Sequence, residues 1–209
     1  VYASYLAKKY GHEISCLINI ASKNEDSFMF HTPNVYLCKF QAESMGLPLL
    51  SVKTIGNKEE ELKDLEIAIR DAINKYKIEG VVTGAVESVY QAARIQQVCH
   101  KLNLECFNPL WQKNQLALLG ELVKNKFEVI LVSVAAFSLD KTWIGRKIDK
   151  KFISKISCLQ EKYKINSAGE GGEFESFVLN CPLFDKALRV KNIKLSGEGN
   201  SWRGEVVLK

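Results

Sequence analysis

Three glycines and three glutamates occur within residues 169–175 of the segment SAGEGGEFESFVLNCPLF, residues 167–184. Glu170 and Glu173 flank the pair Gly171-Gly172, and an apolar run typical of a buried strand follows them. Neighbouring carboxylates repel each other unless a cationic group lies nearby. The segment therefore predicts either a loop that binds a cation or a strand-leading turn whose glutamates are solvated or hold Mg²⁺.

A second candidate segment, GAVESVYQAAR, follows the strand-like residues Val81-Val82-Thr83. Ligands of open α/β sheets bind at the carboxyl ends of strands, where this segment would lie. Gly84 would let the backbone approach a ligand closely. Ser88 has the residue type of a helix N-cap, and free N–H groups at a helix start attract phosphate. Arg94 would face the same site or pair with a surface carboxylate, so a phosphate site and a plain helix cap both fit.

Other motifs and the composition narrow the function. The sequence contains no GxxxxGK(S/T) P-loop and no GxGxxG after a first strand. Six cysteines without a CxxC pair and three histidines without ligand spacing predict buried, reduced thiols and no metal site. A net charge of +5 does not by itself indicate nucleic-acid binding, and we expect no direct nucleic-acid partner.

Neither a membrane span nor a leader is expected. No apolar run reaches the roughly 20 residues that a transmembrane helix needs. Residues 1–11 lack the apolar stretch of a signal peptide. We therefore expect a cytoplasmic protein with no membrane partner.

Strand and helix patterns alternate through the first two thirds of the chain, which is typical of a parallel α/β sheet. After residue 140 two helices are followed mainly by strands, with a hairpin turn near Gly197 and Gly199. We expect a parallel α/β domain over 1–125 and a smaller α+β lobe over 126–209. The expected strands are 14–20, 49–52, 80–84, 105–107, 128–135, 174–179, 187–195 and 203–208. The expected helices are 2–10, 35–45, 57–76, 88–102, 115–124, 141–147 and 149–163.

Three blocks of the sequence resemble the diphthine–ammonia ligase family. They are MFHTPN followed by a helix and GLPLL, then GAVESVYQAARIQQVCHKLNLECFNPLW, then SAGEGGEFESFVLNCPLF. The family belongs to the N-type ATP pyrophosphatases, so the resemblance implies a HUP or Rossmann-like nucleotide-binding domain. It also implies an enzyme that adenylates diphthine on translation elongation factor two, after which ammonia displaces AMP and leaves diphthamide.

One element of that family does not occur in the sequence. The superfamily binds pyrophosphate with an SGGKDS-type loop between its first strand and first helix. Residues 1–4 resemble the start of the helix that follows this loop, so we expect the loop to precede Val1. The chain is also too short for the extra C-terminal domains of some eukaryotic relatives, which implies the compact, archaeal-type form.

The resemblance implies a site for ATP and Mg²⁺. The segment after residue 83 would complete the phosphate cradle, and adenine would lie by analogy near the end of the first strand and the MFH segment. The residues so assigned to the nucleotide are Ile20, Met29, His31, Gly84, Ser88, Gln91 and Arg94.

The resemblance also implies recognition of diphthine, whose trimethylammonium cation has no N–H to donate. Carboxylates and aromatic faces are the groups that bind such a cation. A base must in addition take a proton from ammonia, and the sequence does not decide between Glu87 and Glu170. The residues assigned to catalysis are Glu170, Glu173 and Glu87, and those assigned to substrate binding are Gly171, Gly172, Phe174 and Trp111.

Two other functions stay open. A related ATP pyrophosphatase that modifies tRNA usually needs a basic face or catalytic cysteines, whereas the distinctive loop here is acidic. A nucleotide-binding module without turnover is the alternative from a different class, and it would apply if the pyrophosphate loop were absent.

Overall fold

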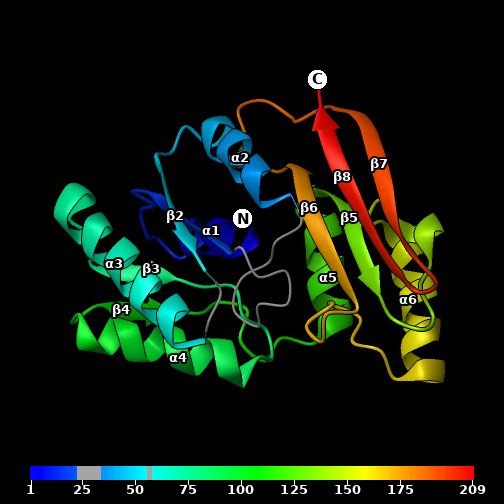
Figure 1. Ribbon diagram of the computed structural model, residues 1–209, viewed down its shortest axis with the longest axis horizontal. Coiled ribbons are helices and arrows are strands. Elements are labelled where there is room, and N and C mark those ends of the chain that lie inside the picture. Colours follow the sequence, from blue (N-terminus) through cyan, green and yellow to red (C-terminus); the bar gives the residue numbers. More distant parts are fainter. Residues whose placement is uncertain (23–33, 56–57) are drawn as a thin grey trace. The chain divides into compact units, whose positions relative to one another are not determined.

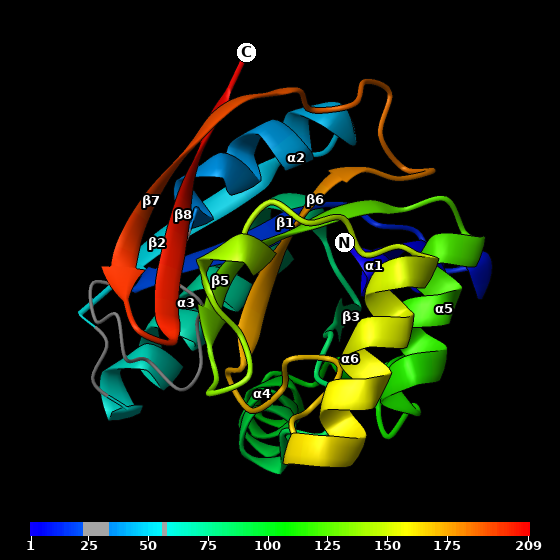
Figure 2. The same cartoon turned by 90° about the vertical axis from the view of Figure 1, so that its right-hand side faces the viewer.

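The computed structural model describes residues 1–22, 34–55 and 58–209, which form two compact units (Figure 1). The first unit is Val1–Gln112 and the second is Lys113–Lys209. Helix α5 (Gln115–Lys124) packs on helix α6 (Lys150–Tyr163), as Figure 2 shows, and therefore belongs to the second unit. The sequence-based division after residue 125 had placed this helix in the first domain.

The first unit alternates helices and strands along the chain. Strands β1 and β2 pair in parallel from Leu17↔Leu49 to Ser22↔Thr54, and β3 and β4 also pair in parallel. The predicted parallel α/β class is confirmed, with the described strands arranged as two pairs. The elements are α1 (Tyr2–Lys9), β1 (Leu17–Ser22), η1 (Val35–Leu37), α2 (Cys38–Ser44), β2 (Leu49–Thr54), α3 (Lys58–Tyr76), β3 (Gly80–Val82), α4 (Val89–Lys101) and β4 (Glu105–Phe107).

The core of the first unit forms where α3 and α4 meet the strands. Leu65 and Ile69 of α3 lie at helical spacing on one face, and they pack with Ile20 of β1 and Val98 of α4. This spacing is what an amphipathic helix needs to cover a sheet with one apolar face. The long helix predicted over 57–76 is therefore positioned by its own hydrophobic pattern.

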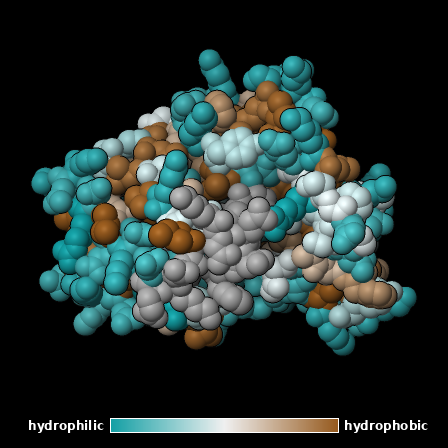
Figure 3. Space-filling model, in the orientation of Figure 1, coloured by the Kyte–Doolittle hydropathy of each residue, from teal (hydrophilic) through white to brown (hydrophobic). Residues whose placement is uncertain are grey.

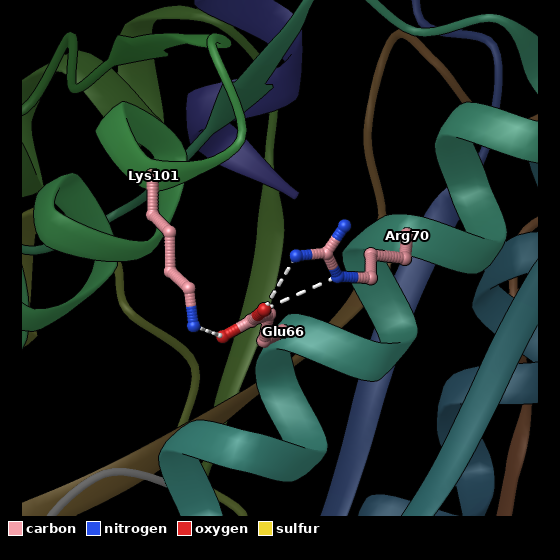
Figure 4. A network of polar contacts seen from close by, with 3 residues as sticks. All are labelled: Glu66, Arg70 and Lys101. Carbon is pink, nitrogen blue, oxygen red and sulfur yellow. Dashed lines mark hydrogen bonds and ion pairs between the residues drawn. The ribbon is translucent and has the colours of Figure 1, made fainter.

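A polar network on the outside of this unit links α3 to α4 (Figure 4). The carboxylate of Glu66 accepts hydrogen bonds from Arg70 Nη2 and from Lys101 Nζ, both at 2.7 Å. The hydrogen bonds from Lys101 and Arg70 lower the pKa of Glu66 below its ordinary value. Arg70 follows Glu66 by one helical turn, whereas Lys101 belongs to the other helix, so the network adds a tertiary contact to a local pair.

The second unit is built on an antiparallel sheet with the strand order β6-β5-β8-β7. Its central strand β5 is almost continuously buried, which explains its β-branched apolar sequence EVILVSVA. The hairpin predicted near Gly197 and Gly199 is confirmed as the turn between β7 and β8. Besides α5 and α6 the elements are β5 (Glu128–Ala135), η2 (Lys141–Trp143), β6 (Phe174–Asn180), β7 (Val190–Glu198) and β8 (Ser201–Leu208).

The helix predicted over 141–147 was wrong, because only a 3₁₀ turn over 141–143 forms there. Gly145 has φ 79°, a left-handed conformation that ends the turn. The chain then extends along β5, where Leu131 N–H donates to Arg146 C=O at 3.1 Å and Ile148 N–H donates to Val129 C=O at 2.9 Å. A tertiary strand contact therefore replaces the helix that the local sequence favoured.

The surface is mixed in polarity. Figure 3 shows teal hydrophilic residues interspersed with small brown hydrophobic areas on the face in view. Across the described part of the chain, no helix is both long and apolar enough to span a bilayer. All six cysteines are free; Cys99 and Cys181 are buried as expected, whereas Cys158 is exposed.

Candidate active site

The β3–α4 loop, residues 83–88, is held by backbone hydrogen bonds at both ends. Thr83 N–H donates to Phe107 C=O at 2.9 Å, and Gln112 N–H donates to Val86 C=O at 2.7 Å. Gly84 is exposed between these two attachments, at the carboxyl end of strand β3. The loop thus occupies the position at which parallel α/β sheets bind ligands.

Helix α4 begins directly after this loop. Ser88 is its N-cap, and the Ser88 hydroxyl accepts a hydrogen bond from Gln91 N–H at 3.3 Å. The guanidinium carbon of Arg94 lies 3.6 Å from the centroid of the Tyr90 ring. Arg94 Nε is buried and has no hydrogen-bond partner in the part of the chain that the structure describes. The predicted phosphate residues Ser88, Gln91 and Arg94 therefore lie together at the N-terminal end of α4.

Two further predicted residues also lie near this loop. Glu87 is an exposed residue of the loop itself. Trp111 follows a turn in which its N–H donates to Asn108 C=O at 3.2 Å, and the next residue, Gln112, is bonded to the loop. Trp111 therefore belongs to the first unit together with the phosphate residues, whereas Glu170 and Glu173 belong to the second.

Of the three residues predicted to lie near adenine, only Ile20 is among the described residues. Ile20 is 6% exposed, and its side chain packs in the hydrophobic core of the first unit. That side chain is committed to the fold, so a contact with a base would need the backbone. Met29 and His31 lie outside the described residues.

The acidic loop, residues 166–173, is organised by the carboxylate of Glu173. Glu173 Oε1 accepts from Asn166 N–H at 2.8 Å, and Oε2 accepts from Gly171 N–H at 2.9 Å. Its backbone C=O accepts from Ala135 N–H at 2.8 Å, which attaches the loop to the end of β5. The acidic sequence predicted that a nearby cation would stabilise these carboxylates. At Glu173, two backbone N–H donors stabilise the carboxylate instead.

Two amide side chains complete this scaffold, and neither was singled out from the sequence. Asn166 Oδ1 accepts from Ala168 N–H at 3.0 Å and from Glu170 N–H at 3.2 Å. Gln115 Oε1, at the start of α5, accepts from Ser167 N–H at 2.7 Å. An Asn at the start of a turn is a recognisable signal, because its side chain often accepts from the backbone two residues on. The contact from Gln115 comes from a distant segment and has no local sequence signal.

The glycines of the acidic loop allow backbone conformations and close contacts that other residues would not. Gly169 has φ 78°, and a Cβ atom there would lie 2.6 Å from the backbone oxygen of Phe174. A Cβ atom at Gly171 would lie 2.8 Å from Glu173 Oε1. Gly172 has φ 85° and open space around it. Gly169, which the prediction had not selected, is the most constrained of these positions.

Phe174 does not offer an exposed ring. It is 5% exposed, and its ring packs edge-on against Phe152 at 6.0 Å. Phe152 packs in the same manner against Trp143 at 5.6 Å. These three rings belong to the core of the second unit.

A hollow of about 630 Å³ lies beside the acidic loop. It is bordered by the start of α5, the last two turns of α6 and the acidic loop, so all its walls belong to the second unit. Its lining is mostly polar, which suits a charged or hydrogen-bonding ligand. The lining residues used below are Gln115, Gln160, Glu161, Lys164, Asn166 and Glu173.

No metal cage is present in the described ranges. Within residues 1–22, 34–55 and 58–209, no three side chains of His, Cys, Asp or Glu gather closely enough to hold an ion.

Comparison with known proteins identifies both units. The N-terminal domain of diphthamide synthase matches residues 1–106, and the C-terminal domain of the same family matches residues 114–206. Diphthine–ammonia ligase of Bos taurus is 34% identical over 200 residues, covering 86% of this chain and 74% of the relative. The Homo sapiens protein of that name is 35% identical over 199 residues, with the same coverage.

A solved structure is also similar, with a lower sequence identity. It is the predicted subunit of tRNA methyltransferase from Methanocaldococcus jannaschii, with 16% identity and a TM-score of 0.42 over 87% of this chain and 91% of that one. At that level the similarity carries no functional conclusion.

The fold defines a broad class of protein, and the comparisons define the family within it. A parallel α/β unit with a helix start at a strand end defines the class of α/β proteins that bind ligands at strand termini. Because both domain families and the curated relatives match, the chain belongs to the diphthamide synthase family. The family resemblance inferred from the three sequence blocks is confirmed.

Proposed function

We propose that the protein is a diphthine–ammonia ligase, which converts diphthine on translation elongation factor two to diphthamide. ATP would activate the diphthine carboxylate as an acyl-adenylate with release of pyrophosphate, and ammonia would then displace AMP. The observation that carries the proposal is the match of both units to the two diphthamide synthase domains. The curated ligases share about a third of their residues with this chain, for example 35% for the Homo sapiens protein.

The first unit would hold the phosphates of ATP. N–H groups at the start of α4 provide partial positive charge, and helix α4 is long enough for its dipole to contribute. The buried Nε of Arg94 lacks an acceptor, which a phosphate oxygen would supply. Mg²⁺ would enter with the phosphates and offset their charge during activation.

The second unit would bind the diphthine side chain. The hollow beside the acidic loop offers carboxylate and amide groups to a polar substrate. Ser167 is 0% exposed, and its hydroxyl has no hydrogen-bond partner among the residues described, so a substrate group that reached it would satisfy a buried polar atom. Glu173 would act as a positioning residue, because two N–H donors occupy its carboxylate.

Glu87 and Glu170 are the two carboxylates proposed for the ammonia proton. Each lies on one of the two loops, and each would need to reach the incoming nucleophile. The reaction would take place in the cytoplasm, where elongation factor two works in translation, and ammonium from solution would be the nitrogen donor.

The test uses the full-length protein with ATP, Mg²⁺, ammonium and elongation factor two that carries diphthine. We expect release of AMP and pyrophosphate that depends on both ammonium and diphthine, with the amide detected by mass spectrometry of the modified peptide. Factor without diphthine and bulk tRNA are the two substrate controls. Release of AMP with tRNA alone would favour a tRNA-modifying enzyme, and ATP binding without AMP formation would favour a non-catalytic module; either result would overturn the proposal.

A further inference from the structure

Two aromatic side chains of the second unit are exposed and in contact. Phe137 is 78% exposed and Tyr163 is 39% exposed. Their ring centroids lie 5.9 Å apart with an interplanar angle of 71°, an edge-to-face arrangement. A single exposed apolar residue needs no explanation, but this pair leaves two ring surfaces open at one place.

The aromatic pair, Phe137 and Tyr163, is carried by two segments that neighbour the acidic loop and the hollow. Tyr163 is the last residue of α6, and its neighbours in that region, Glu161 and Lys164, line the hollow. Phe137 follows the end of β5, where Ala135 N–H donates to the C=O of Glu173. Both segments that carry the rings are therefore attached to the walls of the hollow.

The Tyr163 ring already has a cation near its face. Lys162 Nζ lies 4.9 Å from the ring centroid. An aromatic face attracts a cation through its quadrupole, and this attraction needs no N–H donor from the cation. Lys162 is exposed on a flexible side chain, so a better-fitting cation would displace it at low cost.

The other groups considered for a quaternary ammonium are otherwise engaged. Phe174 is buried in the core, and the Glu173 carboxylate accepts two backbone N–H bonds. Trp111 belongs to the first unit. Phe137 and Tyr163 are exposed aromatic residues of the second unit, and they lie on segments attached to the walls of the hollow.

We propose that Phe137 and Tyr163 bind the trimethylammonium group of the diphthine side chain, in place of Lys162. This proposal rests on the proposed function and specifies which residues recognise the substrate. The methyl groups would pack on the two rings, and the carboxylate of Glu161 at the rim of the hollow would offset their positive charge. The aromatic pair thereby selects the trimethylated substrate over its unmethylated precursor.

The kinetic test compares Phe137→Ala and Phe137→Tyr with the wild type. Loss of one ring should raise KM for diphthine-bearing factor about tenfold, as the range of cation–π energies implies. The KM for ATP and kcat should stay near the wild-type values, and Phe137→Tyr should restore the low KM. Leu195→Ala, which removes an exposed apolar side chain of strand β7, is the matched control and should have no effect.

A substrate with an unmethylated amine distinguishes cation recognition from general protein docking. If Phe137→Ala raises KM equally for the methylated and unmethylated factors, the aromatic pair is a docking surface and the proposal is wrong. An unchanged KM for the methylated factor would also overturn it.

A binding measurement keeps the proposal testable even if the protein does not amidate diphthine. Tetramethylammonium chloride is the probe, with sodium chloride at equal ionic strength as the control. We expect saturation transfer from the wild-type protein to the probe's methyl protons, reduced several-fold in Phe137→Ala and in Tyr163→Leu. Equal transfer in wild type and both variants would reject the aromatic site, independently of any result for the ligase reaction.

Discussion

The β3–α4 loop and the acidic loop both contain glycine and glutamate, but side chains contribute to their stabilisation to different extents. Backbone bonds hold the β3–α4 loop, with Thr83 bonded to Phe107 and Gln112 bonded to Val86. The acidic loop has backbone bonds as well, such as Gly172 N–H to Gly169 C=O. It depends in addition on side chains, because the carboxylate of Glu173 and the amides of Asn166 and Gln115 accept its N–H groups.

This difference determines which polar groups each loop can offer to a ligand. A loop held by backbone bonds keeps the N–H groups at the following helix start available, which suits an anion such as phosphate. A loop held by its own side chains uses them to maintain its shape. In the acidic loop a single substitution should therefore alter the conformation of the whole segment, whereas in the β3–α4 loop it should alter one contact.

The largest effect is expected at Gly169. Alanine there would have to adopt φ 78° and would place its Cβ 2.6 Å from the Phe174 oxygen. We expect Gly169→Ala to destabilise the protein by about 1–3 kcal/mol and to reduce ligase turnover strongly. Urea unfolding and AMP release would measure the two effects.

Gly120→Ala is the matched control for this substitution. Gly120 lies within α5, and no atom lies within 4 Å of its would-be Cβ. Alanine should be neutral there or stabilise the helix by about 0.5–1 kcal/mol. If both variants behave alike, the acidic loop does not depend on the conformation described here.

The next effect is expected for Glu173→Gln. The glutamine amide group would replace one acceptor oxygen with a donor that faces a backbone N–H, so the loop should lose about 1–3 kcal/mol of local stability. We expect ligase activity to fall while the global unfolding midpoint changes little, because the acidic loop is at the surface. Hydrogen exchange at residues 166–173 would report the local loss.

Glu198→Gln provides the comparison for that variant. Glu198 is exposed in β7, so its conversion to glutamine should change neither exchange in the acidic loop nor turnover. Wild-type turnover in Glu173→Gln would contradict the positioning role.

A smaller effect is expected for Ser88→Ala in the β3–α4 loop. Removal of this N-cap should cost about 0.5–1 kcal/mol, since its hydrogen bond to Gln91 is long. The proposed phosphate site should weaken as the helix start frays, so KM for ATP should rise a few-fold. Asn114→Ala removes the N-cap of α5, where Asn114 Oδ1 accepts from Ala117 N–H, and should cost stability without changing KM for ATP. An equal change in KM in both variants would show that the effect is not specific to the β3–α4 loop.

The smallest effect is a change in chemical reactivity at Cys106, which precedes the Phe107 that anchors the β3–α4 loop. A hydrogen bond from the Cys99 thiol lowers the pKa of Cys106 to about 7. Cys106 is therefore protonated at lower pH, and its alkylation by iodoacetamide should rise as the pH increases from about 6 to about 8. Peptide mapping by mass spectrometry would follow the rate, with the exposed Cys158 as a reference in the same digest.

Cys99→Ala tests the cause of that reactivity. Without the Cys99 donor, the alkylation midpoint of Cys106 should move to higher pH, toward that of an ordinary thiol. An unchanged midpoint would show that the contact between the two thiols does not control the pKa.

The sequence predicted helices and strands correctly where local hydrophobic spacing determines them. The spacing of Leu65 and Ile69 indicated a helix that covers a sheet, and both lie in the core. The β-branched run 128–135 indicated a buried strand, and it forms the centre of the second sheet. The prediction failed over 141–147, because hydrogen bonds to the distant strand β5 hold that segment extended.

For the two candidate loops, the sequence indicated a helix cap but not which side chains are buried or hydrogen-bonded. Ser88 was expected to cap a helix and does so. The role expected for Phe174 assumed an accessible ring, but Phe152 covers that ring. Gln115 and Phe137 drew no attention in the sequence, because nothing near either residue indicates a contact with the acidic loop or with Tyr163.

The sequence by itself determined the family, the parallel and antiparallel halves, and the two loops that carry polar residues. These properties depend on residue order and on hydrophobic spacing over a few turns or strands. Only the tertiary structure decided which of those polar groups are occupied and which rings are exposed. Hydrogen bonds and burial depend on residues that are distant in the chain, so residue type alone could not tell that Glu173 holds a loop or that Phe137 remains open.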